Sequence, residues 1–303
     1  ETSKLTQLHI YMKKQIAIAS AILAASSYSF AEIALTESLS VEGFVDMSWS
    51  DTDISESTLG IDQVEFDFLF SAGAVSAQVD VEYEEAGNAT EIEQAFVTYD
   101  LGNGSAFTAG RFASQLGFED FEPTGLYQYS NAISTRNLPG YDQGIKYTIG
   151  SFGIAVVDGV TDGQIADGGG YSIEVAYSTE LGEGLNGFVG ARFNEPDTGA
   201  DSHVINAYLT YETGAWLFAG EVAQNDAAVD TTDYQIMANY TLSDSSSVTA
   251  RYAVAEDSGD AITLAYLTAL ADNLALVAEV TQFSPDGSGD DVVGSAVELL
   301  FTF

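Results

Sequence analysis

Carboxylates are the most abundant side chains in this sequence that could act on an ion or a solute. The 303 residues include 46 Asp and Glu against 8 Lys and Arg, a formal net charge of -38, and no cysteine. Such an excess attracts cations and repels nucleic acids, whose binding depends on Lys and Arg contacts to phosphate. The lack of cysteine excludes disulfides, thiolate metal sites and cysteine nucleophiles. The chemistry that remains is electrostatic attraction of cations by the carboxylates.

Catalysis would depend on His203, the one histidine after residue 31. Ser202 precedes it, but neighbours in a strand point to opposite faces, so a nucleophile for a His203 base would have to come from elsewhere. Gly182, Gly184 and Gly187 fit the G-x-G-x-x-G pattern without the strand-then-helix unit of a nucleotide site, and turn glycines explain them. An enzyme centred on His203 therefore stays a minor hypothesis.

Acidic loops could hold Ca²⁺ through oxygen ligands, as in the segment with Asp286, Ser288, Asp290 and Asp291. None fits the twelve-residue calcium-loop template, so we interpret them as solvated surface acids. The sequence thus predicts no cofactor and no metal site.

The first 31 residues are typical of an export signal. From Met12 the chain reads Lys13 and Lys14, then an apolar run over 16–25, then small residues at 29 and 31. This run is too short to span a bilayer, and the pattern predicts a secretory signal peptide cleaved after Ala31, behind an upstream extension with no structural role. A short anchor helix is the alternative. The mature domain, 32–303, keeps five basic residues: Arg111, Arg136, Lys146, Arg192 and Arg251.

Hydrophobicity then alternates with period two, which indicates strands. The segment 63–70 sets Val64, Phe66, Phe68 and Phe70 against Gln63, Glu65 and Asp67. The segments 39–49 and 75–84 repeat this arrangement of one apolar and one acidic face. A soluble antiparallel sandwich alternates in the same way, so the connections have to decide between a sandwich and a membrane barrel.

Short turns and longer loops alternate along the chain. The expected short turns lie at 71–73, 101–103, 150–151, 180–185, 213–214, 242–245 and 270–273. The expected longer loops lie near Asp51 and Glu85 and at 114–140, 161–169, 195–201, 225–231, 256–259 and 284–290. These connections predict an all-β, up-and-down antiparallel transmembrane barrel of about 16 strands, with short periplasmic turns and long extracellular loops. A count of 14 or 18 follows if one hairpin is split or merged.

Aromatic residues gather at both ends of the expected strands, as the two interfacial belts of a membrane barrel require. Those beside short turns or the C-terminus are Phe70, Tyr99, Tyr211, Trp216, Phe301 and Phe303; those beside longer loops are Trp49, Tyr83, Tyr171, Phe193 and Tyr234. Scattered core aromatics of a sandwich are the alternative. The last strand sets Leu299, Phe301 and Phe303 on one face, and this ending resembles the C-terminal assembly signal of Gram-negative outer-membrane proteins.

One stretch resembles a known family. It comprises Ala109-Gly110-Arg111-Phe112, Leu116-Gly117-Phe118-Glu119, Glu122-Pro123-Thr124, Tyr129-Ser130, Leu138-Pro139, Tyr141 and Gly144-Ile145-Lys146-Tyr147. This is similar to the putative beta-barrel porin 2 (OmpL-like) family, with Asp158 where the family usually has Asn. The match is specific over about residues 106–160, and the general Gram-negative porins are a close second. Both resemblances imply a passive pore for small hydrophilic solutes and no catalysis.

In a barrel the polar face of each strand lines the lumen, because a Lys or Arg on the lipid face costs about 2–4 kcal/mol at mid-depth. The predicted acidic lining is Glu42, Asp46, Glu65, Asp67, Asp80, Glu82, Glu174, Glu221 and Glu298. Lys146, Arg192 and Arg251 share the polar face, whereas Arg111 shares a face with Phe107 and needs a bulge or the rim to explain it. Carboxylate rings favour cations, so we expect cation preference.

The longest loop, 114–140, carries Glu119, Asp120 and Glu122. In general porins the third loop folds into the barrel, so the resemblance implies that these acids line a constriction. Facing them across the pore could be the basic residues Arg111, Lys146, Arg192 or Arg251. The alternative is that the loop lies outside and its acids are solvated.

The sequence as a whole predicts a cation-preferring diffusion porin of the Gram-negative outer membrane. Its expected partners are membrane lipid, the assembly machinery that reads the C-terminal strand, small hydrophilic solutes and cations, and, by the porin resemblance, two further copies in a homotrimer. Nucleic acid is not expected. The rival hypothesis is a non-conducting surface barrel whose acidic loops bind a ligand, divalent cations or a protein.

Overall fold

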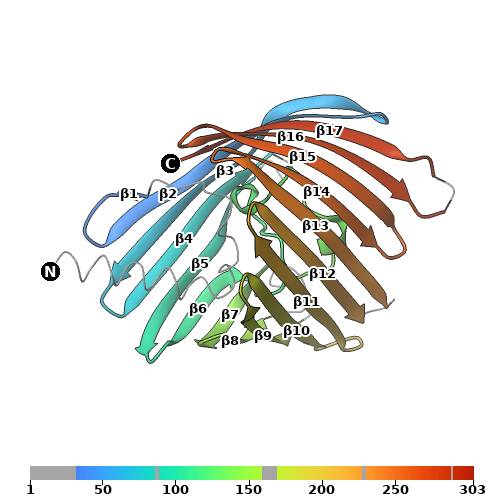
Figure 1. The fold of residues 1–303 in the computed structure, drawn as a ribbon. Coiled ribbons are helices and arrows are strands. Elements are labelled where there is room, and N and C mark those ends of the chain that lie inside the picture. Colours follow the sequence, from blue (N-terminus) through green and yellow to red (C-terminus); the bar gives the residue numbers. More distant parts are fainter. Residues whose placement is uncertain (1–31, 86–88, 159–168, 227–229, 288) are drawn as a thin grey trace.

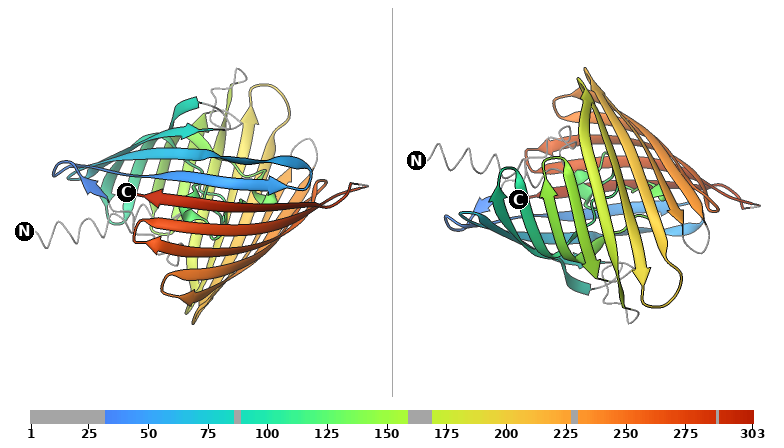
Figure 2. Two further views of the ribbon diagram at one scale, coloured as in Figure 1. Left: turned by 90° about the horizontal axis from the view of Figure 1, so that it is seen from above. Right: turned by 90° about the horizontal axis from the view of Figure 1, so that it is seen from below.

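The computed structural model describes residues 32–85, 89–158, 169–226, 230–287 and 289–303, and the predicted signal segment lies outside them. Sixteen antiparallel strands, β2 to β17, close into a barrel as β17 pairs with β2 (Figures 1 and 2). The short β1 pairs with the start of β2. This confirms the predicted all-β barrel and its 16 strands.

The strands run in chain order around the barrel, each hydrogen-bonded to its sequence neighbours. They are β1 (Ile33–Ala34), β2 (Leu39–Thr52), β3 (Ser55–Ala72), β4 (Val75–Glu84), β5 (Ala89–Gly102), β6 (Ser105–Ala113), β7 (Tyr141–Ile149), β8 (Phe152–Asp158), β9 (Gly170–Gly182), β10 (Leu185–Pro196), β11 (Ser202–Thr213), β12 (Trp216–Asp226), β13 (Thr231–Ser243), β14 (Ser246–Ala255), β15 (Gly259–Ala271), β16 (Leu274–Pro285) and β17 (Val292–Thr302).

Two of the expected long loops are short. β2 ends at Thr52 and β3 begins at Ser55, while β14 ends at Ala255 and β15 begins at Gly259. The β2–β3 hairpin extends further than hydrophobicity indicated because hydroxyl side chains continue the pairing: the Oγ1 of Thr52 lies 2.6 Å from the Oγ of Ser55. The strict alternation of long and short connections was therefore wrong at these two places, although the seven short turns lie where they were predicted.

Each strand exposes its apolar face and buries its polar one. On β3, Phe66 and Phe68 are 42% and 39% exposed, whereas Glu65 and Asp67 are 3% and 9% exposed. This is the reverse of a water-soluble sandwich, in which the apolar faces meet in the core. Most of the aromatic residues expected in belts are exposed: Trp49, Phe70, Tyr99, Tyr171, Phe193, Tyr211, Trp216 and Tyr234.

The last residue completes the closure of the barrel. The backbone N–H of Phe303 donates to the carbonyl of Gly43, and the N–H of Gly43 donates to the carbonyl of Phe303, both at 3.0 Å. The Phe303 ring lies 5.3 Å from that of Phe66 and 5.9 Å from that of Phe301. Leu299, with Phe301 and Phe303, belongs to the outward parity of β17.

The two helices of the described residues are 3₁₀ turns, η1 (Pro123–Gly125) and η2 (Ile133–Thr135). Neither is long and apolar enough to cross a membrane. Both lie in the segment 114–140 between β6 and β7, hereafter the inner loop.

Candidate functional site

The inner loop runs inside the barrel, where Figures 1 and 2 show it in green between the walls. Its base is closed by a hydrogen bond from the N–H of Ser114 to the carbonyl of Gly140, at 2.8 Å. From there its side chains and backbone reach the inward faces of strands on several sides of the barrel. The candidate site is thus the space between this loop and the walls around it.

The inward faces of β9 to β14, hereafter the loop-binding wall, hold the loop by its backbone. Glu174 of β9 accepts hydrogen bonds from the N–H of Gln115 and the Oγ of Ser114, both at 2.7 Å. Glu221 of β12 accepts one from the N–H of Phe118 at 2.8 Å. These two carboxylates were predicted to line the lumen. They face inward, but both oxygens of Glu174 and the Oε1 of Glu221 accept from the loop, and the Oε2 of Glu221 accepts from Gln235 of β13.

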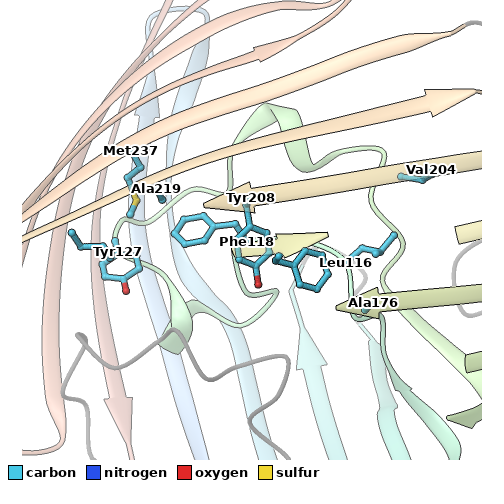
Figure 3. Packing of buried hydrophobic residues seen from close by; sticks show 10 residues of the cluster. Leu116, Phe118, Tyr127, Ala176, Val204, Tyr208, Ala219 and Met237 are labelled. Carbon is cyan, nitrogen blue, oxygen red and sulfur yellow. The ribbon is translucent and has the colours of Figure 1, made fainter. Parts of the chain in front are cut away.

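A hydrophobic cluster fills the space between the loop and this wall (Figure 3). Leu116, Phe118 and Tyr127 of the loop meet inward-facing residues of β9 to β13, which are Ala176, Phe188, Val204, Tyr208, Leu217, Ala219 and Met237. The ring of Tyr208 stacks on Phe188 with centroids 4.6 Å apart and meets Phe118 edge-on at 5.8 Å. The sequence pattern predicted an inward face that is polar throughout. Here the inward face is instead apolar and forms a small core.

Glu119 lies in direct contact with Arg251 of β14. Its Oε1 is 2.7 Å from the Nη1 of Arg251, and both side chains are 2% exposed. The same guanidinium donates to the carbonyl and Oγ of Ser130 at 2.7 and 3.0 Å. Arg251 is thus an anchor of the loop and does not face Glu119 across a gap.

Asp120 and Glu122 extend the loop's acidic segment toward β3. Glu122 accepts hydrogen bonds from the Nε2 of Gln63 at 3.1 Å and from the hydroxyl of Tyr141 at 2.8 Å. Asp120 accepts one from the N–H of Phe121 at 2.8 Å. Burial raises the pKa of both carboxyls above the ordinary range. The loop's three acids therefore differ: Glu119 is ion-paired, and the other two are held by neutral donors.

The inward faces of β2 to β5 and β17, hereafter the acidic wall, lie on the other side of the loop. Their buried carboxylates are Asp46, Glu65, Asp67, Asp80, Glu82, Glu93 and Glu298. Glu42, also predicted to line the lumen, pairs in register with Asp67. Five of the seven have a buried oxygen without a hydrogen-bond partner among the described residues: Asp46, Asp67, Asp80, Glu93 and Glu298.

The other basic candidates do not meet the loop's acids through the contacts that the described residues show. Arg192 of β10 pairs with Asp142 of β7, both buried. The Nζ of Lys146 lies 4.4 Å from the ring centroid of Phe112. Arg111 donates from Nε to the carbonyl of Glu93 at 2.6 Å. Arg251 alone of the four predicted bases contacts one of the three loop acids within the described structure.

The rim carries the predicted His203. Its Nδ1 lies 3.1 Å from a carboxylate oxygen of Asp226, and both side chains are partly exposed. The adjacent Ser202 accepts a hydrogen bond from the Nδ2 of Asn194 at 3.0 Å. The histidine and the serine thus have separate partners.

Sequence reasoning missed several buried acids and the apolar cluster. Glu279 of β16 accepts hydrogen bonds from the N–H groups of Tyr129 and Ser130 at 3.0 and 3.1 Å. The inward position of Glu279 could have been predicted from the sequence, because Val277, Glu279 and Thr281 lie on the same face of an alternating strand. Glu93 was hidden by a break in the alternation of β5, where the β4–β5 register shifts between Val79 and Val81.

Comparison with known proteins gives one family and one fold. The sequence profile described as "Putative beta-barrel porin-2, OmpL-like" matches residues 42–288. No curated protein sequence matches the chain.

Among solved structures, the chain is similar to the anion-selective porin from Comamonas acidovorans, with a TM-score of 0.67 at 17% identity over 88% of this chain and 99% of that one. It is also similar to OmpT expressed in the outer membrane of Vibrio cholerae, with a TM-score of 0.64 at 12% identity over 90% and 100% of the two chains. A trimer form of in-vitro folded OmpT from Vibrio cholerae gives a TM-score of 0.61 at 12% identity over 88% and 99%.

Proposed function

The chain belongs to the putative beta-barrel porin-2 (OmpL-like) family of outer-membrane channels for small solutes, and from that premise we propose that it is a cation-preferring diffusion pore narrowed by residues 114–140. Hydrophilic solutes would pass through the part of the lumen that the inner loop leaves open. The observation that carries this proposal is the row of buried carboxylates on the acidic wall opposite Asp120 and Glu122. Such a lining concentrates cations and depletes anions.

The basic side chains do not offset this charge. Arg192 is paired with Asp142 and Arg251 with Glu119, so each contact is neutral as a unit. The acidic wall has seven buried carboxylates, more than the basic side chains of the mature chain. The porin from Comamonas acidovorans has a similar fold and is described as anion-selective. Selectivity therefore has to follow from inward-facing side chains, which in this chain are acidic.

Planar-bilayer recording of the refolded protein tests the proposal. Under a KCl gradient the sign of the reversal potential should report cation preference, and the preference should weaken at high salt, where the Debye length falls to about 3 Å at 1 M. An anion-favouring potential would overturn it.

A triple variant tests the constriction. Changing Glu119, Asp120 and Glu122 together to Gln, Asn and Gln should alter both conductance and selectivity. The matched control, Glu183→Gln with Asp244→Asn and Asp272→Asn, removes the same charge at short turns and should alter neither. Equal behaviour of the two triple variants would retire the constriction.

One observation favours the rival, a barrel that does not conduct. The apolar cluster around Phe118 and Tyr208 occupies part of the lumen, and a lumen closed by its loop would leave the acidic surface for binding alone. The same recording decides: discrete conductance steps support the pore, whereas a folded barrel without steps supports the rival.

Four further parts of the proposal concern export, membrane contact and assembly. Residues 1–31 would be the cleaved export signal, Leu299, Phe301 and Phe303 would be read by the assembly machinery, and the outward face would meet lipid. By analogy with the trimer form of OmpT, three copies would associate. Mass spectrometry of the mature N-terminus tests the first part. Deletion of Phe303, which should lower the amount of folded barrel in the membrane, tests the second, and cross-linking in native membranes tests the trimer.

A further inference from the structure

Three carboxylates of the acidic wall converge on one point. Glu65 of β3, Asp80 of β4 and Glu93 of β5 each offer an oxygen, and these oxygens all lie within 4.8 Å of one another. The residues are 3%, 0% and 7% exposed. They come from three adjacent strands of a closed sheet, so their separation is fixed by the backbone.

A bulge in β5 builds this convergence. Val79 pairs with Ala95 and Val81 with Ile92, so two residues of β5, Glu93 and Gln94, stand opposite Asp80 alone. Both turn inward: Gln94 donates to Asp80 at 2.8 Å, and Glu93 joins the carboxylates. Bulges commonly re-aim side chains at functional sites.

An additional buried carboxylate points to a missing ligand. Asp67, 9% exposed, is not one of the three converging residues, yet it stands directly opposite Asp80 in the β3–β4 register. Its Oδ1, like the Oδ1 of Asp80 and the Oε2 of Glu93, has no hydrogen-bond partner among the described residues. Buried polar atoms are rarely left without a partner, so these oxygens require one.

Neutral amides supply only part of what these carboxylates need. Gln78 and Gln94 donate to the Oδ2 of Asp80 at 2.9 and 2.8 Å, which leaves the orphaned oxygens unchanged. Carboxylates this close cannot all be ionised without a positive charge between them. Either protons or a cation must be shared.

We propose that Glu65, Asp80 and Glu93, with Asp67 beside them, bind one Ca²⁺ ion on the inner wall. Calcium takes oxygen ligands at about 2.3–2.6 Å, so ligands on opposite sides of the ion lie about 5 Å apart, close to the spacing of this cluster. Magnesium, at about 2.0–2.1 Å, needs a tighter octahedron and retains water, which suits a buried carboxylate cage less well. The ion would also sit near Glu122, because the Nε2 of Gln63 lies 3.1 Å from a Glu122 oxygen and 3.5 Å from a Glu65 oxygen.

This site does not depend on conduction, so its failure and that of the pore are distinguishable. Equilibrium dialysis of ⁴⁵Ca²⁺ against the full barrel refolded in detergent, at neutral pH and physiological salt, should give one saturable site per chain that excess Mg²⁺ displaces poorly. The double variant Glu65→Gln with Glu93→Gln should lose it, and Asp80→Asn should weaken it at least about tenfold.

The control variant is Asp46→Asn, which removes a buried inward carboxylate of β2 outside the cluster and should leave Ca²⁺ binding intact. Protease resistance of each variant reports whether its barrel has folded. Absence of a saturable site in the wild type would overturn the proposal in favour of shared protons. Binding that survives in the folded double variant, or equal competition by Mg²⁺, would overturn it as well.

Discussion

The two walls of this barrel use the same inward parity in opposite ways. On the loop-binding wall, Glu174 and Glu221 accept hydrogen bonds from the inner loop, and Arg251 pairs with Glu119. On the acidic wall, carboxylates face one another and several of their oxygens have no partner within the described structure. One wall therefore holds the loop, and the other carries the charge.

The two walls should contribute differently to the stability of the folded barrel. A buried carboxylate that accepts N–H bonds or pairs with Arg recovers much of its desolvation cost, whereas one beside other carboxylates does not. The loop-binding wall should therefore contribute to stability. The acidic wall should cost stability, as sites shaped by function commonly do. The free energy of urea unfolding in detergent micelles measures how much each wall contributes to stability.

The largest loss should follow from Arg251→Met. It would leave Glu119 as a buried carboxylate without its charge partner, which typically costs about 3–5 kcal/mol. The double variant with Glu119→Gln should recover part of the loss, because the neutral amide leaves no buried charge unpaired and its one oxygen can still accept from Gln128 or Ala132. The comparison is with Arg136→Met: its side chain is 34% exposed, and its buried partner Asp233 also accepts hydrogen bonds from Asn137 and Glu256, so the loss should be smaller than that at Arg251. Equal losses of unfolding free energy at Arg251 and Arg136 would mean that the fully buried ion pair does not stabilise the barrel more than the partly exposed one.

Leu116→Ala should cost somewhat less, about 3 kcal/mol, because it opens a cavity in the apolar cluster. Leu116 is 3% exposed and packs where a Cβ on Gly190 would collide with it. The loosened loop should also raise single-channel conductance if the pore proposal holds. Leu242→Ala, at an exposed strand end, is the control and should change stability by under about 0.5 kcal/mol. A cost near zero for Leu116 would mean that the cluster does not hold the loop.

The barrel was predictable because its rule is local. Each strand alternates residue by residue, so the burial of Glu65 and the exposure of Phe66 follow from sequence position alone. Turn residues then set the number of strands. The extension of the β2–β3 hairpin was not predicted because Ser and Thr continue a strand without a hydrophobic pattern.

The site was less predictable because its contacts join distant residues. The sequence placed Glu119 and Arg251 in the lumen, but their contact crosses 132 positions and no local pattern encodes it. Met237 and Tyr208 break the polar inward parity because Phe118 of the loop packs among them, which no local pattern reveals. The bulge that turns both Glu93 and Gln94 inward breaks the alternation on which the reasoning relied.

The acidic side of the loop should show its cost through pH. Burial raises the pKa of Glu122, so the folded state binds this proton more tightly than the unfolded chain does. Its contribution to stability is full below the ordinary glutamate pKa and is lost as the pH rises through the folded value. Glu122→Gln should remove this slope, which is at most about 1.4 kcal/mol per pH unit for one proton.

Unfolding curves of the wild type and Glu122→Gln in EDTA, across acid and neutral pH, check this sign with no cation bound beside Glu122. The variant should be relatively more stable at neutral pH, and the two proteins should converge in acid, where the wild-type carboxyl is protonated. A gap that widens toward acid pH would mean that the charged form of Glu122 is the stabilised one, and the loop's contact with the acidic wall would then carry no electrostatic cost.

The smallest effect should come from Tyr129→Phe, where the loop meets the acidic wall. The Tyr129 hydroxyl lies 3.1 Å from the Oγ of Ser48 and 3.4 Å from a carboxylate oxygen of Asp62. Losing these bonds should cost only about 1 kcal/mol, because neutral hydrogen bonds contribute little net stability. Tyr99→Phe, on the exposed outer face, should cost less still. A loss of unfolding free energy at Tyr129 as large as that at Arg251 would mean that both walls hold the loop equally strongly. The two walls would then not differ in their role.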